Sequence, residues 1–237
     1  METRAFIYQD NYQGVLFRRN YISAVFVWMA LGLGITGGVA AWLLSVSVIR
    51  EVMTSNRELF VALFVVELFL VWGMTLWLEK LSLLRTVCVG LSYAVLNGIT
   101  WAALFYLFTG ESVAFMFYVA AATFALGSLY ALLFSKDMIR AGNIWRLLPV
   151  GVAVVFLFNY SLGNGGLYWI MSFAGIIIFT CHTVSDVRQL RGPAERAAID
   201  RRSCFKSAVQ GALMLYLDFM NLVLFFLRIV GGRRQDS

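Results

Sequence analysis

The chain has 237 residues, of which 61% are hydrophobic and 14% are charged, and its formal net charge is +6. This composition is too apolar for a water-soluble domain of this length, so the chain is predicted to be an integral membrane protein. A positive charge can indicate nucleic-acid binding, but the basic residues here fall mainly in loops between apolar segments, and no nucleic-acid partner is expected.

Apolar segments recur along the whole chain, and seven of them approach the roughly 20 residues that a helix needs to cross a hydrocarbon core of about 30 Å. The first twenty residues carry charges and no cleavage site follows, so no signal peptide is expected. We predict one all-α membrane domain, residues 1–237, with a short cytoplasmic N-terminal segment at 1–20. The predicted transmembrane helices are 21–48, 59–78, 86–108, 113–134, 144–160, 167–189 and 208–230.

The basic residues predict the orientation of these spans. With a cytoplasmic N-terminus, fourteen of the 19 lysines and arginines lie inside, which the positive-inside rule favours. The polar stretch 190–207 is then a cytoplasmic loop, and its last residues suggest that the seventh helix starts below the membrane surface. An odd number of spans places the C-terminal tail outside, whereas a re-entrant last segment would place it inside. The five basic residues on the outer side are Arg50, Arg57, Arg228, Arg233 and Arg234.

Small residues within the spans predict where helices approach one another. Gly34 and Gly38 lie in the first span, Ala120 and its neighbours in the fourth, and Gly211 in the last. Lipid provides no hydrophobic force between helices, so small residues that allow close backbone contact often mark the interfaces. We assign these residues to packing and give them no chemical role.

Three carboxylates lie inside the apolar segments: Glu67, Asp186 and Asp218. A charge near the bilayer centre costs about 2.5 to 3.5 kcal/mol on insertion scales, so such residues normally face a polar interior and mark an ion or proton path. Transport is therefore the first functional hypothesis.

Four stretches of the chain resemble the Bax-inhibitor family of membrane proteins, and the resemblance extends over residues 16–231. They are residues 78–100, 124–138, 179–190 and 216–228, of which the last, YLDFMNLVLFFLR, is the most specific. The sixth span departs from the family pattern, because T-A-Y-D-T-Q is replaced by the sequence T-V-S-D-V-R at 183–188. The aspartate is kept, but the tyrosine, the second threonine and the glutamine are not.

The resemblance implies a seven-helix bundle with the last helix at its centre and a pH-sensitive calcium leak. It also implies that the aspartates matching Asp186 and Asp218 form a pair near the cytoplasmic mouth. Two facing carboxylates in a low-dielectric site cannot easily both ionise, so they share a proton and can sense pH. Calcium prefers six to eight oxygen ligands, so a site of two carboxylates, with help from Asn221, would bind it weakly and transiently. The alternative is a structural polar pair that fixes helix register.

Three further residues are candidates for accessory roles. Glu67 is either a second conduction ligand or the acceptor of a structural hydrogen bond. His182 lies four residues before Asp186 and could tune the pair, although an ordinary interior histidine is favoured. Arg188 either extends toward the cytoplasm or reaches back to the carboxylates. In the second case it would weaken calcium binding, and the channel would stay open to lower pH than an Arg188→Gln variant.

Other functional classes have weaker support in the sequence. There is no G-x-S-x-G or H-E-x-x-H motif, and the two aspartates lack the motifs of intramembrane aspartyl proteases, so no enzymatic activity is expected. No cofactor is expected, and calcium enters only as the permeant ion. The main rival to a channel is a non-transporting regulator that binds partner membrane proteins, such as proteases or stress-response factors. The location expected for either is a bacterial inner membrane.

Overall fold

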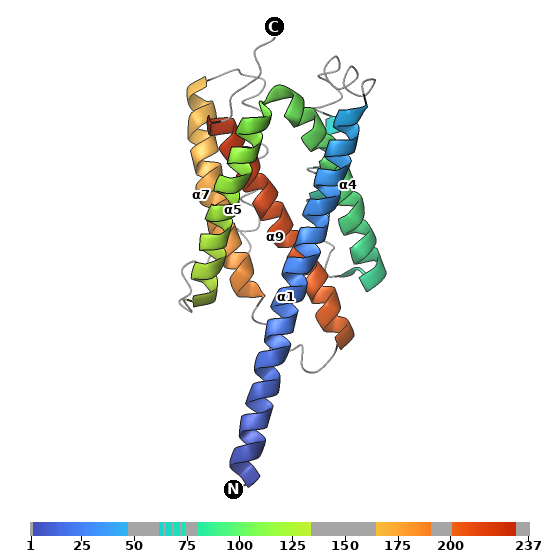
Figure 1. Cartoon of the computed structure of the whole chain (residues 1–237), viewed down its shortest axis with the longest axis vertical. Helices are drawn as coiled ribbons and strands as arrows, with labels where there is room; N and C mark the ends of the chain where they lie inside the picture. The colour runs from blue at the N-terminus through green and yellow to red at the C-terminus, as the bar shows by residue number, and fades with distance from the viewer. Residues whose placement is uncertain are drawn as a thin grey trace.

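The computed structural model of the chain describes residues 2–46, 80–133, 165–190 and 201–230, together with residues 62, 63, 65–67, 69–71 and 73. The described residues are almost entirely helical and contain no strand, in agreement with the predicted all-α class. The long helices are α1 (Glu2–Ser45), α4 (Leu83–Leu107), α5 (Gly110–Leu133), α7 (Gly165–Gln189) and α9 (Arg201–Val230) (Figure 1).

Four of these helices are long and apolar enough to cross a membrane: residues 19–45 of α1, 83–106 of α4, 110–133 of α5 and 204–229 of α9. The helix α7 is 25 residues long and is not among the four; its second half carries polar side chains. The predicted fifth span lies outside the described residues and the second is described only in part. The predicted count of seven therefore stays a prediction.

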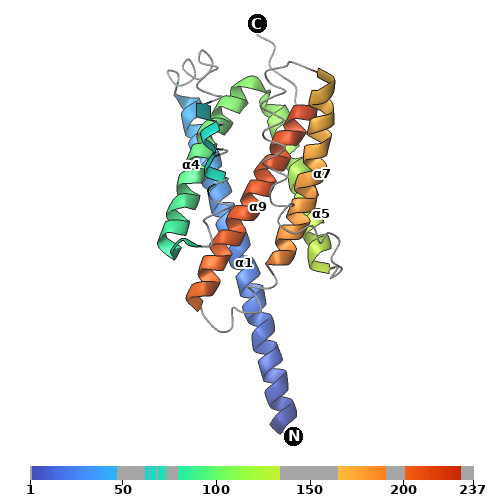
Figure 2. The ribbon, with the colours of Figure 1, turned by 180° about the vertical axis from the view of Figure 1, so that it is seen from behind.

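The described helices run in two opposite directions. In Figures 1 and 2, α1, α4 and α9 run upward, whereas α5 and α7 run downward. The turn between α4 and α5 is short, and the hydroxyl oxygen of Thr109 accepts a hydrogen bond of 3.3 Å from the backbone N–H of Ser112 at the start of α5. The end of α7 and the start of α9 consequently lie at the same end of the bundle as the start of α1 (Figure 1).

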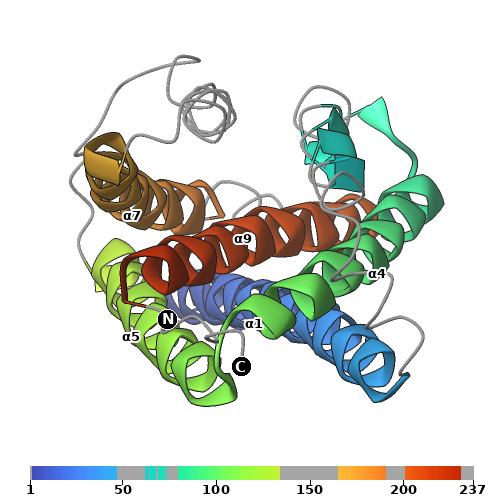
Figure 3. The same cartoon turned by 90° about the horizontal axis from the view of Figure 1, so that it is seen from above.

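The helix α9 packs against α1, α4, α5 and α7 and passes between them (Figure 3). Tyr216 and Asp218 are both buried. Residues two positions apart point about 200° from each other around a helix, so α9 is covered by protein on opposite sides. By contrast, large apolar residues of α1 and α5, such as Leu31, Phe115 and Tyr118, are exposed on the outside of the bundle. Lipid tails are as apolar as these side chains, so a bilayer accommodates them without cost.

Two predicted boundaries differ from the structure. The N-terminal segment 1–20 is part of α1, which has 44 residues, spans about 66 Å at ~1.5 Å per residue and projects beyond the other helices (Figures 1 and 2). The predicted loop 190–207 ends earlier, because α9 begins at Arg201. Hydropathy gives the bounds of only the apolar part of a helix, so it does not define the polar turns with which α1 and α9 begin.

The small residues divide into two groups. Gly211 approaches Leu190, and Ala120 is fully buried, so these two were correctly predicted to lie at interfaces. The prediction for Gly34 and Gly38 is wrong among the described residues, since a Cβ added at either would have no heavy atom within 4 Å. The close approach of α1 to α4 occurs instead at Gly98, where an added Cβ would lie 2.8 Å from the carbonyl oxygen of Thr36.

Candidate cation site between α7 and α9

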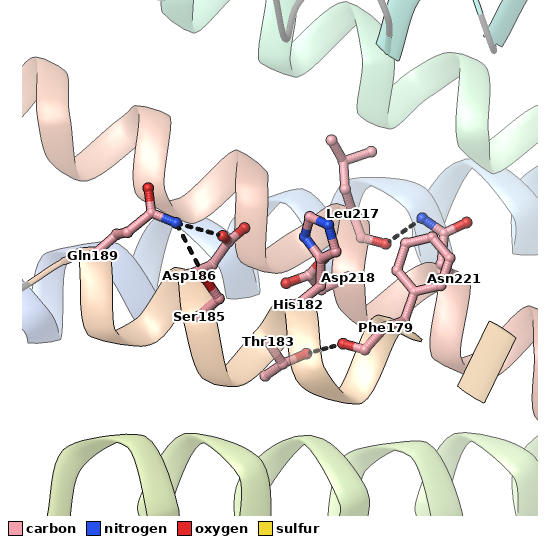
Figure 4. A network of polar contacts seen from close by, with 9 residues as sticks. All are labelled: Phe179, His182, Thr183, Ser185, Asp186, Gln189, Leu217, Asp218 and Asn221. Atoms are coloured by element: carbon pink, nitrogen blue, oxygen red, sulfur yellow. Dashed lines mark hydrogen bonds and ion pairs between the residues drawn. The ribbon is translucent and has the colours of Figure 1, made fainter. Parts of the chain in front are cut away.

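A buried cluster of three ionisable side chains lies between α7 and α9. His182 and Asp186 project from one face of α7, because residues four apart are neighbours on a helix, and Asp218 projects toward them from α9 (Figure 4). One potential ligand atom from each residue lies within 4.8 Å of the other two. The residues are 8%, 9% and 3% exposed, respectively, so the cluster is shielded from solvent.

The starting point of α9 brings the two aspartates to the same depth. Asp186 is one turn from the end of α7, whereas Asp218 lies about 25 Å along α9 from Arg201, at ~1.5 Å per residue. The two can meet only because α9 begins well below the end of α7. The early start of α9 is the feature that the polar run at the beginning of this helix suggested.

Among the described residues, the contacts of the cluster leave Oδ2 of Asp218 without a hydrogen-bond partner. Nδ1 of His182 lies 3.8 Å from Oδ1 of Asp218, which is an ion pair when the histidine is protonated. Oδ2 of Asp218 is buried and has no hydrogen-bond partner within the described part of the chain. Oδ1 of Asp186 accepts a hydrogen bond of 3.1 Å from the side-chain amide of Gln189 (Figure 4). The cluster thus retains acceptor capacity for a proton or a cation.

Aromatic rings pack beside the cluster. The ring centroid of Phe179 lies 6.1 Å from that of His182, and Phe179 also stacks on Phe225 of α9 at 5.6 Å. Gly175 permits this packing, because a Cβ at that position would overlap the ring of Phe225. These apolar neighbours lower the local polarity, which strengthens electrostatic interactions inside the cluster.

Two of the predicted accessory residues have other contacts. The guanidinium carbon of Arg188 lies 5.5 Å from the centre of the Tyr130 ring on α5, and no ion pair joins Arg188 to either aspartate among the described residues. Its Nε and Nη2 atoms are buried without a hydrogen-bond partner in the same part of the structure. The side-chain amide of Asn221 donates to the carbonyl of Leu217 at 2.8 Å, one turn earlier in α9. In the described part of the chain, the contacts of these two residues are with groups other than the carboxylates.

Glu67 belongs to a different polar group. It is 6% exposed and accepts a hydrogen bond of 2.9 Å from Thr100 of α4. Nearby, the hydroxyl groups of Thr36 and Tyr216 are 2.7 Å apart, on the side of α9 that faces α1. This geometry fits a structural hydrogen bond, which is one of the two roles considered for Glu67. The structure does not place Glu67 in the cluster of His182, Asp186 and Asp218.

The structure adds geometry for two residues beside the aspartates. His182 was favoured as an ordinary interior residue, and the structure places it in the cluster, with Nδ1 3.8 Å from Oδ1 of Asp218. Gln189 was not considered, although it is three residues after Asp186 and therefore on the same face of α7. The spacing of three and four residues from Asp186 already placed Gln189 and His182 on its helix face. This became informative only once the position of the facing helix α9 was known.

Comparisons with known proteins agree with the resemblance seen in the sequence. The family model described as "Inhibitor of apoptosis-promoting Bax1" matches residues 18–235. The inner membrane protein YbhL of Escherichia coli (strain K12) is 32% identical over 217 residues, which cover 91% of this chain and 93% of that protein. A protein of Borreliella burgdorferi is 30% identical over 94% of this chain and 97% of its own length. A protein of Deinococcus radiodurans is 30% identical over 91% of this chain and 91% of its own length.

Proposed function

Because this chain belongs to the Bax-inhibitor family, we propose that it is a pH-sensitive leak channel through which calcium crosses the membrane passively. The observation that carries the proposal is the buried pair of Asp186 and Asp218, contributed by two helices of a membrane bundle. Carboxylates inside a membrane protein are costly and normally line an ion or proton path. No catalytic residue is part of this proposal.

The chemistry of the pair suits transient binding. Two carboxylates offer at most four oxygen atoms, fewer than the six to eight that calcium prefers, so water or backbone carbonyls must complete the shell. A conducting site has to release its ion, and weak coordination allows this. Protons compete for the same oxygen atoms, because two close carboxylates in a low-dielectric site tend to share one proton. The leak is therefore expected to decrease when the pair is protonated.

The proposed location is the inner membrane, in which the relative YbhL is placed by its description. We place the lower end of the bundle in Figure 1 in the cytoplasm, with seven spans and α9 at the centre. The positive-inside rule supports this orientation, since the basic side chains that the structure describes lie at that end with the exception of Arg228. They are Arg19, Lys80, Arg85, Arg188 and Lys206.

The test is calcium flux into proteoliposomes that contain only the purified full-length chain and a trapped calcium dye. Asp218→Asn removes an ionisable oxygen site and is expected to abolish the pH-dependent flux of the wild type. Glu111→Gln is the matched control, because Glu111 is an exposed carboxylate in the first turn of α5, outside the cluster. Equal pH-dependent flux in the wild type and Asp218→Asn would contradict the proposal.

The N-terminal half of α1 supports a second candidate function. It projects beyond the other helices and offers a surface for contacts outside the bilayer (Figure 2). A non-transporting regulator that binds partner membrane proteins would need such a surface. Two results together would favour the regulator over the channel. The purified wild type would show no calcium flux, and it would capture a membrane protein that a chain lacking residues 1–18 does not retain.

A further inference from the structure

We propose that His182, Asp186 and Asp218 form a binding site for a divalent transition-metal ion such as Zn²⁺, which the cluster binds more tightly than calcium. The inference rests on the proposed role of the cluster as a cation site, and it adds the class of ion that this chain prefers there. The feature that sets the preference is His182, which sequence comparison with the family pattern did not single out.

The ligand set distinguishes transition metals from calcium. Calcium takes oxygen ligands almost exclusively, whereas imidazole nitrogen suits zinc and other late first-row ions. Zinc sites that keep an open position commonly use three protein ligands, with water in the fourth position. The cluster offers one imidazole and two carboxylates, which is a ligand set of this kind.

The distances permit such a site after small side-chain movements. Ligand atoms about 2.1 Å from a tetrahedral zinc ion are about 3.4 Å from one another. Nδ1 of His182 and Oδ1 of Asp218 are 3.8 Å apart, so they would approach by only a few tenths of an ångström. The widest separation in the cluster is at most 4.8 Å, which rotation of a carboxylate can shorten. Because calcium also fits these distances, the nitrogen ligand and not the size of the site gives the selectivity.

An unsatisfied atom points to a ligand independently of the cluster's composition. Oδ2 of Asp218 has no hydrogen-bond partner among the described residues, although the side chain is only 5% exposed. A buried carboxylate oxygen without a partner is costly, and a bound cation would satisfy it. Around it, the amide of Gln189 holds one oxygen of Asp186, as outer hydrogen bonds commonly orient metal ligands.

The experiment measures metal binding to the purified full-length protein in detergent, after dialysis against a chelator. Zn²⁺ is titrated in competition with a chromophoric chelator, and Ca²⁺ in a separate calorimetric titration. We expect one Zn²⁺ per chain, bound more tightly than Ca²⁺. His182→Leu should weaken Zn²⁺ binding by about 100-fold, since loss of an outer partner alone costs about 10-fold to 100-fold, and should leave Ca²⁺ binding within about threefold. Asp218→Asn should weaken the binding of both ions.

The matched control is Glu67→Gln, which alters a buried carboxylate outside the cluster and should change neither affinity. Substitution of Co²⁺ for Zn²⁺ provides a readout on the wild type alone, because its visible absorption reports coordination by the protein and does not depend on the folding of a variant. Zn²⁺ binding unaffected by His182→Leu, Zn²⁺ binding no tighter than that of Ca²⁺, or a Co²⁺ spectrum identical to that of the aqueous ion would overturn the inference. Binding is measured without flux, so tight Zn²⁺ binding in a chain that conducts no calcium would support this site and contradict only the leak.

Discussion

Substitution of Gly98 by alanine tests the contact between α1 and α4. The added Cβ would lie 2.8 Å from the carbonyl oxygen of Thr36 and 2.8 Å from Cβ of Val39. Carbon atoms prefer separations of about 3.5 to 4.0 Å, and a Cβ atom essentially never lies within 3.0 Å of another heavy atom, so both contacts are too short. Neither neighbour can rotate away, because one is backbone and the other is the branch point of a β-branched side chain. The two helices must therefore move apart.

The expected cost follows from three contributions. Overpacking of a tight interface costs about 1 to 3 kcal/mol. Displacement of Thr36 also stretches its buried hydrogen bond of 2.7 Å to the hydroxyl of Tyr216, which contributes about 1 kcal/mol. Alanine favours a helix over glycine by up to about 1 kcal/mol, which offsets part of the loss. The free energy of unfolding should fall by about 1 to 3 kcal/mol in total.

Gly34→Ala provides the control on the other helix of the same pair. An added Cβ at Gly34 meets no heavy atom within 4 Å, so only the gain in helix propensity remains. Both variants and the wild type would be unfolded by denaturant in the same detergent, with helix content followed by circular dichroism. Gly98→Ala should unfold at lower denaturant than the wild type, and Gly34→Ala at the same or higher denaturant. Equal midpoints for the two variants would refute the assigned contact.

Two further predictions concern orientation and the basic residue near the site. In a cysteine-free background, a cysteine that replaces the exposed Glu111 should react with an impermeant thiol reagent added to intact cells. A cysteine that replaces the exposed Lys80, at the opposite end of the bundle, should react only after the cells are opened. The reverse labelling pattern would show that the topology is inverted. Arg188→Gln should leave the pH of half-maximal calcium flux unchanged, because the guanidinium lies over the ring of Tyr130 and not beside a carboxylate. A shift of that midpoint in either direction would mean that Arg188 reaches the pair in the conducting state.

The sequence by itself determined the membrane class, the family and the position of most spans. The predicted span 86–108 corresponds to α4 at Leu83–Leu107, and the span 113–134 to α5 at Gly110–Leu133. These predictions succeeded because a run of apolar residues long enough to cross a bilayer is a property of the local sequence. The resemblance implied that Asp186 and Asp218 lie close together, and the polar start of the last helix agreed with this by indicating where the helix begins.

Only the tertiary structure decided which side of each helix faces protein. It brought His182 to Asp218, turned Arg188 toward Tyr130, and placed the close helix contact at Gly98 and not at Gly34. In a water-soluble protein, hydrophobic periodicity identifies the buried face of a helix. In a membrane, lipid is as apolar as the protein interior, so the periodicity that would distinguish these faces is weak, and the partner of each side chain depends on the packing of the neighbouring helices.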